Sequence, residues 1–126
     1  MSAPIRLAIV GGRRGGSFNS ALQAFRDLIE LAAVCDTDGG VLEKWQSELP
    51  GVKAFARYED VLNEPSVDAV LLATPMMLHA RQAIDALNAG KHVLSEVIAA
   101  TSIADCWDLV AAVEAAGLTY MMDENF

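Results

Sequence analysis

Residues 6–18 read RLAIVGGRRGGSF, an apolar run followed at once by a cluster of glycines. The run at 6–10 has the length of a buried strand, and the residues behind the glycines have helical spacing. A strand, a glycine-rich turn and a helix in this order are typical of the phosphate-binding turn of a Rossmann-type sheet. The apolar residues that predict the helix, as one buried stripe, are Phe18, Ala21, Leu22, Phe25, Leu28 and Ile29.

Outward from this turn, strand-length apolar runs alternate with segments of helical periodicity through the whole chain. Further strands are predicted at 31–35, 52–56, 68–73, 91–95 and 118–122, and further helices at 42–49, 58–63, 80–87 and 103–113. Gly90 and Gly117 stand where helix-ending glycines are expected, and Ser102 with Asp105 resembles a capping box. The alternation predicts an α/β, doubly wound, six-stranded parallel sheet of order 3-2-1-4-5-6 with helices on both faces.

Size and composition narrow the class of protein. A chain of 126 residues fits one domain, which we expect to span residues 1–126. The formal charge of −8 argues against nucleic-acid and anionic-membrane partners. The N-terminus has too few apolar residues before the glycine pair for a secretory signal, so we expect a cytoplasmic protein. Cys35 and Cys106 lie far apart within apolar segments, which favours two reduced core thiols over a redox pair or a metal site.

The glycine-rich turn supplies the first candidate binding residues. Gly11 is suited to the tight turn, and Gly16 to close approach of helix and strand. The helix-opening amides near Gly15, Gly16 and Ser17 would direct partial positive charge at a pyrophosphate. The candidate cofactor-binding residues of this turn are Gly11, Gly12, Arg13, Arg14, Gly15, Gly16 and Ser17.

Two features bear on which dinucleotide is bound. The middle glycine of G-x-G-x-x-G is replaced by Arg13, so that side chain must swing outward or the cofactor must shift. Asp36 ends the second strand, where a carboxylate binds the adenosine ribose and repels a 2′-phosphate, which favours NAD. Arg13 or Arg14 could instead pair with a 2′-phosphate, which leaves NADP open.

A SAM-binding fold is the nearest alternative to a dinucleotide-binding fold, and the complete sixth strand argues against it.

Residues 73–97, ATPMMLHARQAIDALNAGKHVLSEV, together with RLAIVGG and the terminal YMMDENF, resemble the N-terminal domain of the Gfo/Idh/MocA oxidoreductase family. The resemblance covers essentially the whole chain. It implies that Thr74 and Pro75 lie against the cofactor. It also makes His79 a candidate cofactor contact, although a histidine bonded to nearby backbone at a helix start explains it equally well.

The family commonly has E-K-P after the fifth strand, where this chain has Glu96, Val97 and Ile98. The resemblance implies that Glu96 lies near the nicotinamide ribose. Val97 has no ammonium group to polarise or protonate a substrate oxygen. Family variants with E-V-P-A include redox-neutral, NAD-dependent glycosidases, and DCWDLV at 105–110 is also similar to them. For Trp107 within that segment, simple helix packing is the favoured interpretation.

The resemblance also implies a second domain that carries the substrate pocket, and we expect this chain to lack it. We therefore assign no catalytic residue and no metal ligand. Three functions stay open: part of an oxidoreductase acting on a sugar, polyol or related hydroxy compound; part of a glycosidase-like enzyme; and a free-standing NAD-binding module. A homodimer is expected through an exposed apolar edge whose candidate residues are Met76, Met77, Met121, Met122 and Phe126.

Overall fold

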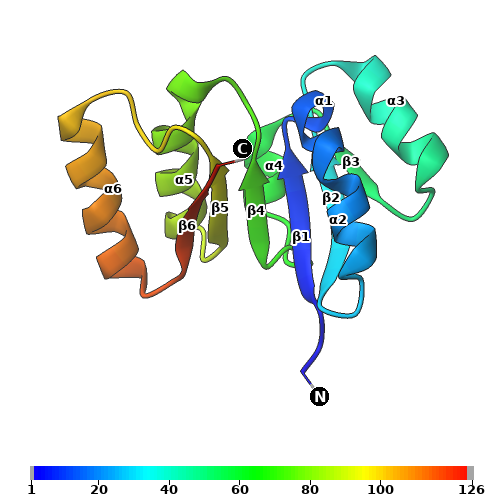
Figure 1. The fold of residues 1–126 in the computed structure, drawn as a ribbon, viewed down its shortest axis with the longest axis horizontal. Helices are drawn as coiled ribbons and strands as arrows, with labels where there is room; N and C mark the ends of the chain where they lie inside the picture. The colour runs from blue at the N-terminus through cyan, green and yellow to red at the C-terminus, as the bar shows by residue number, and fades with distance from the viewer. Residues whose placement is uncertain (1, 125–126) are drawn as a thin grey trace.

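The computed structural model describes residues 2–124 as a single six-stranded parallel sheet (Figure 1). The strands are β1 (Ile5–Val10), β2 (Ile29–Cys35), β3 (Lys53–Phe55), β4 (Ala69–Leu72), β5 (His92–Glu96) and β6 (Tyr120–Asp123). Their order is β3-β2-β1-β4-β5-β6, and every pairing is parallel. The predicted fold class and strand order are confirmed.

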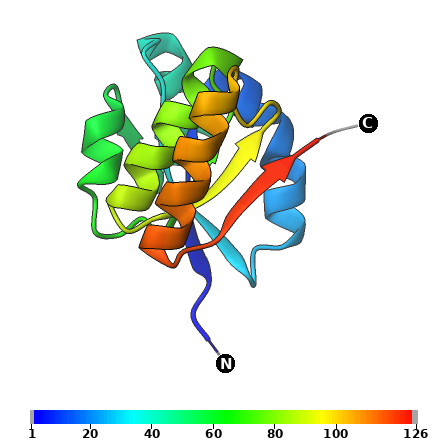
Figure 2. The same ribbon diagram turned by 90° about the vertical axis from the view of Figure 1, so that its left-hand side faces the viewer.

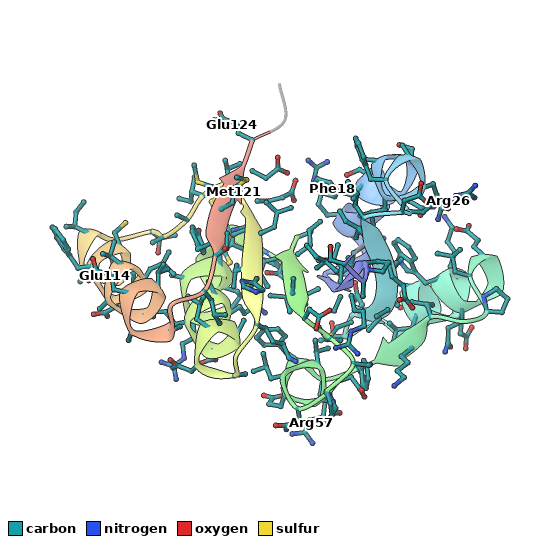
Figure 3. The ribbon with its side chains drawn as sticks, turned by 90° about the horizontal axis from the view of Figure 1, so that it is seen from below. Phe18, Arg26, Arg57, Glu114, Met121 and Glu124 are labelled. Atoms are coloured by element: carbon teal, nitrogen blue, oxygen red, sulfur yellow. The ribbon has the colours of Figure 1, made fainter. Side chains whose placement is uncertain are left out.

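The helices are α1 (Gly12–Gly15), α2 (Asn19–Ala24), α3 (Gly39–Glu48), α4 (Tyr58–Leu62), α5 (His79–Asn88) and α6 (Ile103–Ala116), with short 3-10 turns η1 (Gly16–Phe18) and η2 (Met76–Leu78). They cover both faces of the sheet: Figure 2 shows α5 and α6 on one side and α2 on the other. Figure 3 likewise places Phe18, just before α2, and Arg57, just before α4, on opposite sides.

Two apolar clusters form the core, one on each face of the sheet. Strand β1 contributes to both, because successive side chains of a strand point to opposite faces. Ala8 and Val10 pack with the α4, α5 and α6 side, whereas Leu7 and Ile9 pack with the α2 and α3 side. A central strand buried on both faces explains why residues 6–10 read as a continuous apolar run.

The first long helix is shorter than predicted. It ends at Ala24, and Ile29 already begins β2. The chain reverses between them through a turn in which the amides of Leu28 and Ile29 both donate to the carbonyl of Phe25, at 2.8 and 2.9 Å. Phe25 and Leu28 are consequently 55% and 65% exposed, so the prediction of one buried stripe from 18 to 29 is wrong.

The last helix has both predicted ends but an unpredicted surface. Ser102 Oγ accepts from the amide of Asp105 at 3.1 Å, and Gly117 closes the helix with φ 64°. Because α6 lies at the outer end of the sheet (Figure 1), only its Leu109 side is buried. Trp107 is 69% exposed, so the interpretation of Trp107 as a packing residue is wrong.

The exposure of the methionines and cysteines can be compared with the predictions. Met76, Met77, Met121 and Met122 are exposed as predicted, and Met121 is labelled on β6 in Figure 3; Phe126 lies outside the described residues. Both cysteines are free, with Cys35 buried and Cys106 half-buried, and burial raises the pKa of the Cys35 thiol to about 11. Within residues 2–124, no helix combines the length and apolarity that crossing a membrane requires.

Candidate cofactor site

A cavity of about 810 Å³ opens where β1 and β4 lie side by side at the carboxyl ends of the strands. The chain runs from β1 outward to β2 and β3, then returns to β4 and continues in the opposite direction. Ligands of open α/β sheets bind at this kind of reversal. The cavity is lined by residues of four connections, among them Gly11, Asp36, Tyr58 and Thr74.

Gly11 makes the tight turn at the floor of this cavity. Its φ is 94°, a left-handed conformation that residues with a Cβ rarely adopt. A Cβ at this position would also lie 2.5 Å from the carbonyl oxygen of Ala73, at the end of the neighbouring strand. The tight turn predicted at Gly11 is therefore confirmed.

The close approach of helix and strand occurs at Gly15, not at Gly16 as predicted. A Cβ at Gly15 would overlap the side chain of Ile9 in β1, whereas one at Gly16 would meet only Trp45, at 3.9 Å. The helical segment begins directly after Gly11, so Gly15 comes one turn later on the face that packs against the sheet. Either glycine of the pair fits the sequence motif, and only the start of the helix distinguishes them.

The early start also moves the helix-opening amides. The amide of Gly15 donates to the carbonyl of Gly11 at 2.9 Å, and that of Gly16 donates to Arg14. Ser17 Oγ donates to the same Arg14 carbonyl at 3.0 Å. The prediction that Gly15, Gly16 and Ser17 open the helix is thus wrong, because the first turn starts at Gly12.

Arg13, which replaces the middle glycine, borders the cavity and turns its side chain toward Asp38. Its guanidinium forms an ion pair with Asp38 at 3.0 Å, and its side chain is 80% exposed. Behind it, Gly12 packs against Trp45, whose Nε1 donates to the Gly12 carbonyl at 2.9 Å. Of the two outcomes expected for Arg13, the structure has the outward one.

Asp36 joins the end of β2 to the glycine turn. One carboxylate oxygen accepts from the amide of Gly12, and the other from the amide of Asp38, both at 2.9 Å. Since a carboxylate offers about four lone-pair sites, acceptor capacity remains toward the cavity. The residue therefore has the position and the chemistry needed to bind a diol.

Arg14 and Glu96 form an ion pair that the sequence analysis did not anticipate. Arg14 Nη2 lies 2.7 Å from Glu96 Oε1, and Nε lies 3.0 and 3.1 Å from the two carboxylate oxygens. The Glu96 side chain is 11% exposed and that of Arg14 is 54% exposed. The two residues are 82 positions apart, and only the topology, which puts β1 and β5 on either side of β4, brings them together.

His79 contacts the backbone of the turn that follows β4. The ring is 1% exposed, with Nε2 2.8 Å from the Thr74 carbonyl and Nδ1 3.0 Å from the Ile98 carbonyl. Thr74 Oγ1 lies 2.6 Å from Gln82 Oε1, and Pro75 leads into η2. His79 thus fits the backbone-bonded alternative and connects the loop that contains Thr74 with the loop that contains Ile98.

The far wall of the cavity comes from residues that carry no motif. Tyr58 and Leu78 line it, and the Tyr58 hydroxyl donates to the carbonyl of Gln82 at 2.6 Å. Burial raises the pKa of Tyr58 well above its ordinary value. Tyr58 reads in the sequence as one apolar residue of a short helix, and no spacing links it to α5.

A model of the Gfo/Idh/MocA family, described as an oxidoreductase family with an NAD-binding Rossmann fold, matches residues 5–124. Among curated relatives, the glycosyl hydrolase family 109 protein of Shewanella pealeana is 32% identical over 130 aligned residues, which cover 96% of this chain.

Two solved structures resemble the chain closely. The WlbA dehydrogenase of Chromobacterium violaceum, in complex with NADH and UDP-GlcNAcA, is 32% identical over 98% of the chain, with a TM-score of 0.91. KijD10, a 3-ketoreductase of Actinomadura kijaniata in complex with NADP and TDP-benzene, is 30% identical over 95%, with a TM-score of 0.86. The chain spans 28% of the curated relative and 36% and 37% of these two structures.

Proposed function

The chain belongs to the Gfo/Idh/MocA oxidoreductase family as an NAD-binding Rossmann domain, and from this premise we propose that it binds NAD across the cavity between β1 and β4. It does so on behalf of an oxidoreductase that acts on a sugar, polyol or related hydroxy compound. The observation that carries the proposal is the contact between Asp36 and Gly12, which puts a diol-binding carboxylate beside the phosphate-binding turn.

The residues present fit a dinucleotide. The left-handed Gly11 keeps the turn free of a side chain. The amide of Gly12 is bonded to Asp36, so the amides that follow it in the first helical turn would be the ones directed toward a pyrophosphate. Asp36 would hold the adenosine ribose and Glu96 the nicotinamide ribose. Thr74 and Pro75 would border the cofactor between them. The cofactor supplies the hydride chemistry, and these residues bind and orient it.

The charges around the cavity favour NAD over NADP. Asp36 would repel a 2′-phosphate on the ribose that it binds. Both arginines of the turn border the cavity, but each is paired with a carboxylate, Arg13 with Asp38 and Arg14 with Glu96, which reduces the positive charge offered to a 2′-phosphate. Similar structures hold NADH in WlbA and NADP in KijD10, so the preference rests on the side chains of this chain.

The substrate would be bound by groups outside the residues discussed so far. Val97 stands where the resemblance implies a lysine, and its side chain has no group that could exchange a proton with a substrate hydroxyl. We therefore propose that residues 1–126 supply the cofactor half of a site and are not catalytically competent alone. The complex of WlbA with UDP-GlcNAcA supports a sugar-derived substrate.

A second candidate is the cofactor half of a redox-neutral glycosidase. It is favoured by the 32% identity to a glycosyl hydrolase family 109 protein and by the missing lysine at Val97. In that case the hydride would be taken from the sugar and returned to it, so NADH would not accumulate. Release of a sugar without net change in NADH absorbance would favour this candidate over a dehydrogenase.

The proposal is tested by calorimetric titration of the 126-residue chain with NADH and, separately, with NADPH at moderate salt, which screens unspecific pairing with the arginines. We expect saturable one-to-one binding, with NADH bound more tightly. Tighter binding of NADPH would contradict the cofactor preference, and binding of neither would contradict the proposed function. If the chain binds NADH but neither it nor a longer protein that contains it oxidises or reduces a substrate, the remaining function is a free-standing NAD-binding module.

We further propose that a second copy of the chain pairs with the β6 edge. No other strand pairs with the outer side of β6 in the described sheet, and Met121 on it is 62% exposed. An unpaired apolar edge favours association with an identical edge. Sedimentation that shows only monomer at high concentration would contradict this proposal.

A further inference from the structure

We propose that the ion pair between Arg14 and Glu96 sets the relative affinity of this domain for oxidised and reduced cofactor. The inference rests on the proposed function, because it concerns the same site. It assigns Arg14 a role that neither the sequence motif nor the binding of the adenosine half requires.

The ion pair lies across the carboxyl edge of the sheet. Arg14 belongs to the turn after β1, and Glu96 is the last residue of β5. Because β4 lies between these strands, the arginine side chain crosses the end of β4 to reach the carboxylate. Three short nitrogen to oxygen distances, from 2.7 to 3.1 Å, hold the guanidinium in one orientation.

This position corresponds to the nicotinamide half of a bound dinucleotide. In a Rossmann fold the two mononucleotide halves lie over the two halves of the sheet. Asp36, at the end of β2, marks the adenosine half, which leaves the ends of β4, β5 and β6 for the nicotinamide half. A dinucleotide that extends from Asp36 to Glu96 therefore passes the guanidinium of Arg14.

The nicotinamide ring carries a positive charge in NAD⁺ and none in NADH. A cation fixed nearby disfavours the oxidised ring, and an anion favours it. In the ion pair the charge of Arg14 is compensated by that of Glu96. A second carboxylate, Asp123, is the register partner of Glu96 on β6, and its charge also helps to raise the pKa of Arg14.

The buried state of Glu96 makes the compensation effective. Its side chain is only 11% exposed, so solvent screens its charge less than that of a surface carboxylate. Arg14 keeps roughly half of its side chain exposed, which leaves part of the guanidinium free to face a ligand. The electrostatic potential at the ring would therefore depend on the sum of the two charges, and not on either one alone.

The two ends of the pair consequently predict opposite effects. Arg14→Gln leaves Glu96 and Asp123 uncompensated and should strengthen NAD⁺ binding relative to NADH. Glu96→Gln leaves the guanidinium uncompensated and should weaken it. We expect the dissociation constant for NAD⁺ divided by that for NADH to fall in Arg14→Gln and to rise in Glu96→Gln, each by about threefold to tenfold. Arg14→Lys keeps the charge and should stay close to the original ratio.

The experiment is calorimetric titration of the 126-residue chain and these variants with NAD⁺, NADH and ADP-ribose. ADP-ribose keeps both riboses and the pyrophosphate but has no nicotinamide ring, so it reports binding without the ring and corrects for loss of folding and for any ribose contact of Glu96. Arg26→Gln serves as the control for charge, because Arg26 lies exposed in the turn after α2 (Figure 3). Its ratio should equal that of the unmodified chain.

Opposite shifts in the two neutralising variants, with a near-original ratio in Arg14→Lys, would support the inference. Unchanged ratios, or shifts of the same sign, would overturn it while leaving the proposed function intact. Failure of the unmodified chain to bind any of the three ligands, ADP-ribose included, would instead overturn the proposed function and this inference with it.

Discussion

The carboxylate of Asp36 accepts a hydrogen bond from the backbone amide of Gly12 at 2.9 Å, so the end of β2 is tied to the turn that follows β1. The contact shapes the glycine turn, and in the proposed complex with NAD it would also place a negative charge at the adenosine ribose. Cofactor choice and turn geometry would then depend on the same side chain.

Replacing Asp36 should change the cofactor preference. Asp36→Ala removes the diol acceptor and the repulsion of a 2′-phosphate, so we expect NADH to bind at least tenfold more weakly and NADPH to lose less or gain. Titration with both cofactors measures the ratio. Asp36→Asn, which keeps one oxygen acceptor for the turn, is the matched control for the loss of the Gly12 contact. An unchanged NADH to NADPH ratio in Asp36→Ala would remove Asp36 from the site.

Gly11 and Gly90 provide a matched test of the turn. Both have positive φ, 94° and 82°, but only at Gly11 would a Cβ meet other atoms, the Ala73 carbonyl at 2.5 Å. Gly90→Ala should cost about 1–2 kcal/mol of unfolding free energy from its backbone conformation. Gly11→Ala should cost about 2 kcal/mol more because the turn must shift. Denaturant unfolding measures both, and equal losses would contradict this account of Gly11.

His79 should act on binding through the loops that it connects. His79→Ala removes the buried ring that contacts the half-buried carbonyls of Thr74 and Ile98, so at least one carbonyl loses its donor, and we expect a cost of about 2–3 kcal/mol of stability. It should also weaken NADH binding, because the turn bearing Thr74 loses its support. His79→Gln can still donate to one carbonyl and should recover part of both losses. His92→Ala, which alters an exposed histidine at the opposite edge, should leave NADH affinity unchanged. Unaltered NADH affinity in folded His79→Ala would argue against this positioning role.

Acid should destabilise the domain through the pair between Arg6 and Asp68. Arg6 donates to Asp68 at 2.8–3.0 Å and lowers the pKa of that carboxyl from 3.8 to about 2. Asp68 binds a proton more weakly when folded than when unfolded. Its stabilising contribution is therefore fully present above about pH 4 and is lost as the pH falls toward 2.

Because both side chains are more than a third exposed, solvent screening limits this contribution to about 1 kcal/mol or less. Urea unfolding at pH 5 and pH 2.5 measures it, and Asp68→Asn should lose less stability between the two values than the unmodified chain. Asp108→Asn, at an exposed position of α6, is the control. Equal acid losses in Asp68→Asn and the unmodified chain would contradict the assignment.

The fold was predictable because each strand is an apolar run of the right length. Central strands such as β1 and β4 are buried on both faces, so their residues read as unbroken apolar segments. The predicted strand positions deviate by at most two residues at either end. Glycines at 90 and 117, both with positive φ, likewise marked helix ends correctly.

The errors come from features that only tertiary structure decides. Phe25 and Leu28 fit a helical period, but the chain needs those positions to turn into β2, which leaves both exposed. Trp107 fits a packed helix, yet α6 lies at the end of the sheet and has nothing described against that face. The tandem glycines permitted two alignments of the turn, and the conformation of Gly11 selects one of them.

The candidate site was predictable only in part for the same reason. Gly11 and Asp36 follow from motif spacing within one βαβ unit. The partner of Arg14 lies 82 residues away, and Tyr58 lines the cavity from a helix with no motif of its own. Strand order brings these units together, but which side chains then meet depends on their orientation in space, which spacing along the chain does not encode.

The most direct test of NAD binding in the cavity between β1 and β4 is a titration of the ¹⁵N-labelled chain with NADH, followed by amide chemical shifts. The account predicts saturable shifts at Gly11, Gly12, Thr37 and Thr74, with those of Ile5, Asp68 and His92 at the opposite edge of the sheet unchanged. Shifts confined to the opposite edge, or none at saturating NADH, would contradict it.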